Sequence, residues 1–423
     1  MAKQKMASFV LAVVLILGAN ISFSAASFPT LLTRNYWQNS RPTKMIGWPP
    51  GADPENISPS PSPQPAPTPP PYSDDGIKGG YWPSWLAYSF PPSSIPTLYF
   101  THVFYAFVGI DASTYNLSTT QPDDEWMGNF TATLHAKKPP AKALLSIGGA
   151  NSGPGTFSGM ASDPDNRAAF IKSTIATARK YGFDGLDIDW EFPSNPDDMS
   201  NLSVLFKEWR QAVKSEASDS GKPRLLLSAA VYFASSFLFD LPRTYPGDAI
   251  AKYVDFVNPM CFDYHGSWDT SVTGEHALLY DKSSNISTSY GISSWIEIGV
   301  PSKKLVMGMP LYGRTWELED PKKHKIGDPA IGVGPGDNGI LLYKDIVTYN
   351  ADHHAHTVYD GDTVSEYSYS GTDWIGYDGP TSVAKKVEYA KAHNLGGYFF
   401  WALGYDTNWT LSAAASNAWE GIY

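Results

Sequence analysis

From residue 76 onward, short runs of β-branched and aromatic residues alternate with segments of helical or loop-like composition in this 423-residue chain. Between some runs the apolar period becomes helical, and residues 202, 205, 206, 209 and 213 fall on one helical face. Eight runs are predicted strands, at 77–82, 99–110, 143–147, 185–192, 225–231, 254–260, 305–311 and 397–403. Eight strands alternating with helices predict an α/β fold, and they suit a parallel (β/α)8 TIM barrel better than a doubly wound sheet.

The interval between the seventh and eighth predicted strands is too long for one helical crossover. Its central part, residues 326–377, is rich in Gly, Asp, Tyr and His. We therefore expect a small α+β subdomain, at about 313–375, inserted between strands 7 and 8. Residues 76–423 are expected to form one barrel domain that includes this insertion.

The N-terminus begins with two lysines, continues with an apolar run at 9–17 and ends in small residues at Ala26, which is the order of a secretory signal peptide. An uncleaved anchor is the alternative, although a spanning helix needs about 20 apolar residues. After a signal peptide at 1–26 we expect a disordered proline-rich linker at 27–75, with a proline-binding docking peptide as the alternative. Sequons fit a glycosylated protein that is secreted to the extracellular space or a vacuole, and they lie at Asn56, Asn116, Asn129, Asn201, Asn285 and Asn408.

The formal net charge is −11, which argues against nucleic acid or an anionic membrane as a partner. The single cysteine, Cys261, cannot form an internal disulfide or part of a Cys-pair zinc knuckle. We expect a monomer without a membrane span.

The segment 181–193 alternates acidic and apolar residues, with Asp187, Asp189 and Glu191 on one face of a strand and Leu186, Ile188 and Trp190 on the other. In a barrel the apolar face would pack against helices, so the acids would point inward. Carboxylates spaced about 6.6 Å apart in a low-dielectric interior cannot all ionise, so some keep a proton near neutral pH. Because active sites of barrel enzymes lie at the C-terminal mouth, we predict that Glu191 is a general acid.

A solvated strand face and a Mg²⁺ or Ca²⁺ site remain alternatives for these acids. A retaining glycosidase needs a nucleophilic carboxylate about 5–5.5 Å from the acid across the bond, and an inverting one needs a more distant base. Asp189 lies beside Glu191 on the same face, so it is badly placed for either role. If the protein is a glycosidase, the nucleophile should come from the substrate, as an N-acetyl carbonyl oxygen could supply.

Residues 184–191, DGLDIDWE, resemble the DGxDxDxE signature of the family 18 glycoside hydrolases, the chitinases and their relatives. Further segments resemble motifs of this family in the same order, with features of the plant class V branch: SIGG at 146–149, NPMCFDYHG at 258–266, GMPLYGR at 308–314, WIGYD at 374–378 and GYFFW at 397–401. The resemblance covers nearly all of residues 76–423.

The resemblance implies a chitinase-like hydrolase that cleaves β-1,4 bonds in N-acetylglucosamine oligomers with retention and without a metal or cofactor. Glu191 would protonate the glycosidic oxygen, Asp189 would turn to the N-acetyl nitrogen, and Asp187 would hold the shared proton. Core packing is the alternative for Phe107, and a structural salt bridge is the alternative for Asp263 and Arg314. The resemblance also implies a sugar pocket floored by Trp401 and lined by Tyr81, Phe107, Met260, Asp263, Tyr312 and Arg314.

Two positions depart from the family pattern. Phe262 stands where the family ordinarily has a Tyr whose hydroxyl donates to the attacking N-acetyl oxygen, and loss of one such donor costs about 10²–10³ in rate. Tyr264 would face the same way in an extended strand, but about 6–7 Å further along, so we expect no replacement by it. Ala150 stands where animal relatives often carry a Trp, which weakens the expected stacking in distal subsites.

Phe262 leaves a second hypothesis, a chitin-oligosaccharide-binding lectin or receptor with weak or no catalysis. The intact acidic triplet favours the hydrolase. Lipochitooligosaccharides and glycoprotein glycans are alternative substrates for the same mechanism.

Overall fold

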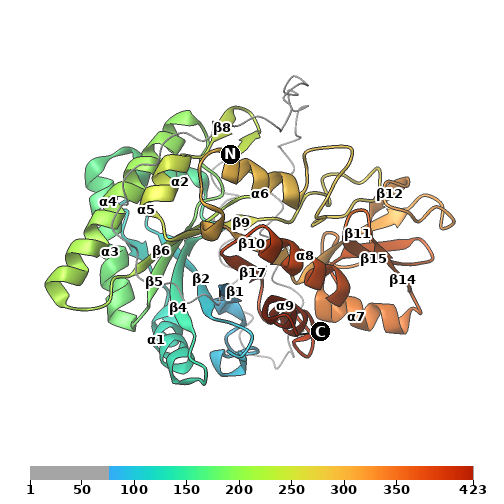
Figure 1. The fold of residues 1–423 in the computed structure, drawn as a ribbon, viewed down its shortest axis with the longest axis horizontal. Helices are drawn as coiled ribbons and strands as arrows, with labels where there is room; N and C mark the ends of the chain where they lie inside the picture. Colours follow the sequence, from blue (N-terminus) through green and yellow to red (C-terminus); the bar gives the residue numbers. More distant parts are fainter. Residues whose placement is uncertain (1–75, 423) are drawn as a thin grey trace, which may run out of the picture.

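The computed structural model describes residues 76–422, and the predicted signal peptide and linker lie outside them (Figure 1). Eight parallel strands follow the barrel order β10-β17-β1-β2-β4-β5-β6-β9, and a parallel bridge between Val257 and Leu305 joins β9 to the start of β10. All eight predicted strands are present, which confirms the TIM barrel. Their bounds are β1 (Ile77–Pro83), β2 (His102–Ile110), β4 (Lys142–Gly148), β5 (Gly185–Asp189), β6 (Leu226–Tyr232), β9 (Phe256–Met260), β10 (Val306–Pro310) and β17 (Gly397–Trp401).

Helices cover the outside of the barrel (Figure 1). The longest, α4, carries the predicted apolar face, whose five residues are all buried. Asp163 caps the start of α3, and Gly182 ends it in the left-handed conformation, with φ 79°. The helices are α1 (Gln121–Ala136), α2 (Pro154–Ser162), α3 (Pro164–Tyr181), α4 (Pro196–Ser220), α5 (Gly247–Tyr253), α6 (Thr288–Glu297), α8 (Pro380–Ala392) and α9 (Thr410–Glu420). None of the helices within 76–422 is both long enough and apolar enough to cross a membrane.

The insertion between β10 and β17 is an antiparallel sheet with one helix, which confirms the predicted α+β subdomain. Its strand order is β12-β11-β16-β15-β14, and β13 pairs with β11. In Figure 1 it projects from one side of the barrel. Its elements are β11 (Tyr312–Leu318), β12 (Ala330–Val333), β13 (Ile340–Leu342), α7 (Tyr343–Asp352), β14 (His356–Asp360), β15 (Ser365–Ser370) and β16 (Asp373–Tyr377).

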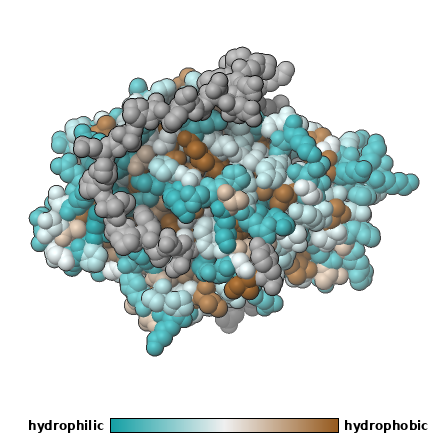
Figure 2. Space-filling view, in the orientation of Figure 1, coloured by the Kyte–Doolittle hydropathy of each residue, from teal (hydrophilic) through white to brown (hydrophobic). Residues whose placement is uncertain are grey.

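Buried side chains form separate clusters on the two faces of the barrel sheet. Leu186 and Ile188 belong to the large cluster between sheet and helices, whereas Tyr81, Phe104 and Phe399 belong to the cluster inside the barrel. The alternation predicted along β5 is therefore correct. On the face shown in Figure 2, hydrophilic residues dominate the described surface and apolar ones are scattered.

Candidate active site

The acidic strand β5 ends at Asp189, three residues earlier than predicted, because the chain bends after this residue. Asp187 and Asp189 lie on the strand and are buried, and Glu191 follows in the bend and is half-buried. Asp184, the first acid of the motif, lies at the other end of β5, where it accepts a hydrogen bond from the Ala143 backbone N–H at 2.8 Å. Only the last three acids of the motif therefore belong to the C-terminal end of the strand.

Asp187 is held by hydroxyl groups from three other strands. Ser146 and Ser228 lie level with it in the register of β4 and β6, and their Oγ atoms donate to its carboxylate at 2.7 and 2.6 Å. The Tyr81 hydroxyl donates to it at 3.0 Å and accepts from Asn258 Nδ2 at 2.8 Å. Burial raises the pKa of Asp187, and the three hydroxyls oppose that rise.

Asp189 has a strongly raised pKa, because it is buried and because Glu191 and Asp187 add negative charge beside it. The protonated form of Asp189 is therefore favoured relative to that of a solvent-exposed aspartic acid. Within residues 76–422 the Asp189 Oδ1 atom is buried and accepts no hydrogen bond, so it is available to a ligand group. Gly148 allows β4 to approach here, because a Cβ on it, at φ 118°, would lie 2.1 Å from the Asp189 carbonyl oxygen.

Glu191 has a raised pKa at the mouth of the barrel. Burial, and next the charge of Asp263, raise its pKa to about 7. A carboxyl with this pKa is protonated in a large fraction of molecules near neutral pH, as general acid catalysis requires. Asp263 itself stays ionised: burial raises the pKa of its carboxyl, but Arg314 and next His276 outweigh burial and hold this pKa well below its usual range.

Aromatic rings form one wall of the mouth above β1, β2 and β17. Phe107 and Trp401 are stacked, with ring centroids 5.5 Å apart and planes inclined by 20°. The Tyr81 ring meets Trp401 edge-on at 5.8 Å. Trp85, which the sequence analysis missed, is 41% exposed and lies 6.3 Å from Trp401 and 6.4 Å from Phe107. Its place just beyond the end of the first predicted strand is the signal that could have found it.

The opposite part of the mouth is built from the segment after β9 and from β11. Met260 and Phe262 pack on the cluster inside the barrel, and Phe262 lies 6.3 Å from Tyr312 between ring centroids. Arg314 donates to Asp263 Oδ1 from Nε at 2.8 Å and from Nη2 at 2.6 Å. The predicted pocket residues therefore group around the acids in two sets, one on each side of the mouth.

Tyr264 does not face the same way as Phe262, so that expectation was wrong. The strand ends at Met260, and Asp263 has a left-handed backbone with φ 61°, which breaks the two-residue alternation. Tyr264 packs on Phe233 in the outer cluster, and its hydroxyl is 3.0 Å from Thr288 Oγ1. It does not reach the barrel interior, which agrees with the expectation that it does not replace the missing tyrosine.

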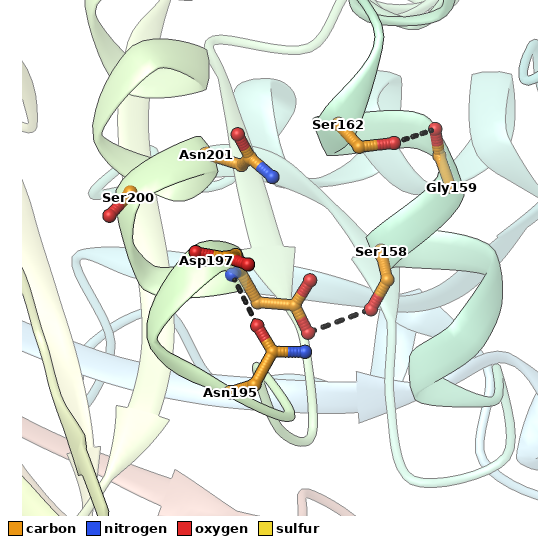
Figure 3. Close-up of a pocket in the computed structure, with 8 residues that line it drawn as sticks. Ser158, Gly159, Ser162, Asn195, Asp197, Ser200 and Asn201 are labelled. Carbon is orange, nitrogen blue, oxygen red and sulfur yellow. Dashed lines mark hydrogen bonds between the residues drawn. The ribbon is translucent and has the colours of Figure 1, made fainter.

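A separate polar hollow of about 540 Å³ lies between α2 and the start of α4, shown in Figure 3. Its lining contains no aromatic ring and none of the predicted site residues. Among the described residues, His, Cys, Asp and Glu form no group of three or more that could hold a metal ion.

A parallel barrel with a proton-bearing carboxyl at its C-terminal mouth, beside an aromatic wall, defines the class of TIM-barrel glycosidases. The model of the glycosyl hydrolases family 18 matches residues 78–406, and the chain belongs to this family.

Plant proteins are among the relatives of this chain. It is 51% identical over 351 residues to the class V chitinase CHIT5 of Lotus japonicus, a match that covers 82% of this chain and 87% of the relative. The structure of a family 18 chitinase from Cycas revoluta in complex with (GlcNAc)3 is similar, with a TM-score of 0.77 and 42% identity over 81% of this chain and 99% of that one. A chitinase-like agglutinin from Robinia pseudoacacia is also similar, with a TM-score of 0.74 and 42% identity over the same shares.

Proposed function

We propose that this protein is a chitinase that hydrolyses β-1,4 bonds in N-acetylglucosamine oligomers by substrate-assisted catalysis with retention. The observation that carries the proposal is the difference in environment among the three carboxyls on and just after β5. Asp187 is fully hydrogen-bonded, Asp189 retains a free buried oxygen, and Glu191 has a pKa of about 7 at the mouth.

In the first step, Glu191 donates its proton to the glycosidic oxygen as the bond from that oxygen to C1 breaks. The carbonyl oxygen of the substrate's own N-acetyl group attacks C1 and gives an oxazolinium ion. Asp189 turns to the N-acetyl N–H and stabilises the positive charge, while Asp187 holds the shared proton. In the second step the Glu191 carboxylate takes a proton from water, and that water opens the oxazolinium ion at C1.

The two sets of pocket residues bind the distorted sugar. Trp401 supplies the floor, on which the apolar face of the sugar packs, and Phe107 supports this ring from behind. Trp85 extends the aromatic wall outward, so it would contact a neighbouring sugar unit. The remaining lining residues are Tyr81, Met260, Asp263, Tyr312 and Arg314.

A chitin-oligosaccharide lectin is the second candidate, and Phe262 is the observation that favours it. This residue packs on Tyr312 and Phe399 and has no hydroxyl for the attacking oxygen. The agglutinin from Robinia pseudoacacia has the same fold and a similar degree of identity to this chain.

Product analysis with N-acetylglucosamine hexamer separates the two candidates. We expect the wild type to cleave the hexamer, Glu191→Gln to abolish cleavage, and Phe262→Tyr to accelerate it by about 10²–10³-fold, the range for one restored donor. Binding of the hexamer without any product from the wild type would establish the lectin instead. Circular dichroism of both variants controls for folding.

We also propose that the protein is exported, glycosylated and monomeric. Asn129, Asn285 and Asn408 are exposed, so glycans on them would not disturb the core. Expression in plant cells, with N-terminal sequencing, peptide-N-glycosidase treatment and light scattering of the secreted product, tests these points. An intracellular product with an intact N-terminus would contradict export.

A further inference from the structure

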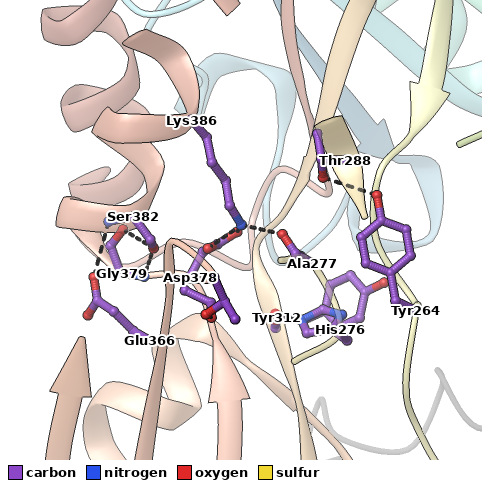
Figure 4. A network of polar contacts seen from close by, with 12 residues as sticks. Tyr264, His276, Ala277, Thr288, Tyr312, Glu366, Asp378, Gly379, Ser382 and Lys386 are labelled. Carbon is purple, nitrogen blue, oxygen red and sulfur yellow. Dashed lines mark hydrogen bonds and ion pairs between the residues drawn. The ribbon is translucent and has the colours of Figure 1, made fainter. Parts of the chain in front are cut away.

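Behind the pocket wall lies a histidine to which the mechanism above gives no role. His276 is fully buried, in the segment between β9 and α6. In Figure 4 its ring lies beside Tyr312, and the two ring centroids are 4.9 Å apart. It therefore touches the same wall that carries Asp263 and Arg314.

One hydrogen bond of this ring fixes its tautomer. His276 Nε2 lies 3.0 Å from the Tyr312 carbonyl oxygen, which can only accept, so Nε2 carries the hydrogen. In the neutral ring Nδ1 is then a lone pair. Nδ1 lies 3.6 Å from Asp263 Oδ1, beyond hydrogen-bond range, and it has no hydrogen-bond partner within residues 76–422.

A lone pair that faces a carboxylate gives no attraction, and a proton on Nδ1 would convert the contact into a charge-assisted hydrogen bond. Burial lowers the pKa of His276, although Asp263 opposes this, so the ring is neutral near neutral pH and gains its proton in acid. Asp263 Oδ1 already accepts both hydrogen bonds from Arg314. Protonated His276 would compete with Arg314 for the same oxygen.

The surroundings hold this ring in place. Lys386 on α8 donates to the carbonyl oxygen of Ala277 at 2.5 Å and to both oxygens of Asp378 at 2.5 Å (Figure 4). The charged groups that act on His276 are thus Asp263 after β9, Arg314 on β11 and Asp378 after β16, with Lys386 balancing Asp378. Since the neighbouring segment is tied down, a proton on His276 would move Asp263 rather than the ring.

We propose that His276 is a positioning residue that makes sugar binding depend on pH: its neutral ring leaves the Asp263 carboxylate to Arg314 and the sugar, and its protonated ring binds that carboxylate itself. This inference deepens the proposed function and rests on it. In acid the pocket should bind N-acetylglucosamine oligomers more weakly through displacement of Asp263, with Glu191 still protonated.

Calorimetric titration with the hexamer in the Glu191→Gln background tests this without turnover and without titration of Glu191. We expect the dissociation constant to rise with a one-proton slope, up to about tenfold per pH unit, below the pKa of His276. Adding His276→Gln should flatten this slope, because the Gln amide can still donate to the Tyr312 carbonyl but cannot gain a proton. His102→Gln is the matched control, since His102 is a buried histidine at the start of β2, at the other end of the barrel.

The proposal would be overturned by an equal pH slope of the dissociation constant in the Glu191→Gln protein with and without His276→Gln. It would also be overturned if His102→Gln removed this slope as fully as His276→Gln does. Side-chain ¹⁵N spectra of histidine-labelled full-length protein give a readout that needs no ligand. We expect the His276 Nδ1 resonance to titrate in acid and to shift its midpoint in Asp263→Asn. The proposal would also be overturned if His276 stayed neutral down to the pH at which the protein unfolds in acid. Absence of hexamer binding at every pH would instead contradict the proposed function.

Discussion

Arg314 donates two hydrogen bonds to one oxygen of Asp263, at 2.8 and 2.6 Å, and thereby keeps a negative charge at the mouth opposite the acidic strand. This charge is one reason for the raised pKa of Glu191, after burial. The salt bridge is thus part of the site's electrostatics and not only a structural contact.

Replacing Asp263 by Asn should shift the alkaline limb of the pH–activity profile to lower pH. The Asp263 charge disfavours the Glu191 carboxylate, so its removal lowers the pKa of Glu191 from about 7, and the general acid loses its proton earlier as pH rises. The measurement is kcat against pH on the hexamer. An unchanged alkaline limb would show that the charge of Asp263 does not reach Glu191.

The same variant leaves the Arg314 guanidinium buried without its counter-charge, which typically costs about 3–5 kcal/mol. The thermal unfolding of this variant should therefore be measured as well, so that its pH–activity profile is recorded well below its unfolding temperature. Glu317→Gln on β11, the strand of Arg314, is a control for loss of a carboxylate, because Glu317 is exposed.

Glu191→Gln should stabilise the folded protein at pH 8 by about 3 kcal/mol and leave its stability nearly unchanged at pH 4. The folded-state pKa of about 7 lies above the usual value of 4.5, so the folded state binds the proton more tightly than the unfolded state does. The wild type therefore loses stability as pH rises between these two values. Urea unfolding at several pH values measures the difference, and a parallel pH dependence in both proteins would contradict it.

Gly148→Ala should destabilise the protein by more than about 3 kcal/mol and abolish activity, because the new Cβ would meet the Asp189 carbonyl oxygen at 2.1 Å. Gly155→Ala on α2 is the matched control. A Cβ there meets nothing within 4 Å, so this change should be neutral or stabilise by up to about 1 kcal/mol. Calorimetric melting of both variants tests the contrast, which similar melting temperatures would refute.

Lys386→Met should destabilise the protein by about 3–5 kcal/mol, because it leaves Asp378 buried without its cation. Asp378→Asn in the same chain should restore part of the loss, since it removes the uncompensated charge. A double-mutant cycle of unfolding free energies measures the coupling. Additive effects of the two changes would show that the pair does not act as a unit.

Local sequence pattern was enough for the strand order and for the orientation of the acids. The two-residue alternation of Asp187 and Asp189 with Leu186 and Ile188 survives in the structure, because one face of β5 must pack on helices and the other must not. The long interval before the last strand likewise predicted the insertion. Strand ends were less certain, as shown by Glu191, which lies in a bend beyond β5.

Contacts between segments distant in the sequence could not be predicted from the local sequence pattern. Trp85 meets Trp401 across 316 positions of sequence only because β1 and β17 are neighbours in the closed barrel. Tyr264 turns away from Phe262 because Asp263 adopts a left-handed backbone, which no apolar pattern announces.

Periodicity and motif spacing are properties of the local chain, and they were sufficient to predict the barrel, its insertion and the inward-facing carboxyls. Which charges face these carboxyls depends on the three-dimensional fold. The pKa of Glu191 depends on burial and on the charge of Asp263. Asp263 in turn lies beside Arg314 and His276, which come from separate segments of the chain. Electrostatic interactions act through space and through burial, and neither is encoded in the local pattern of residues.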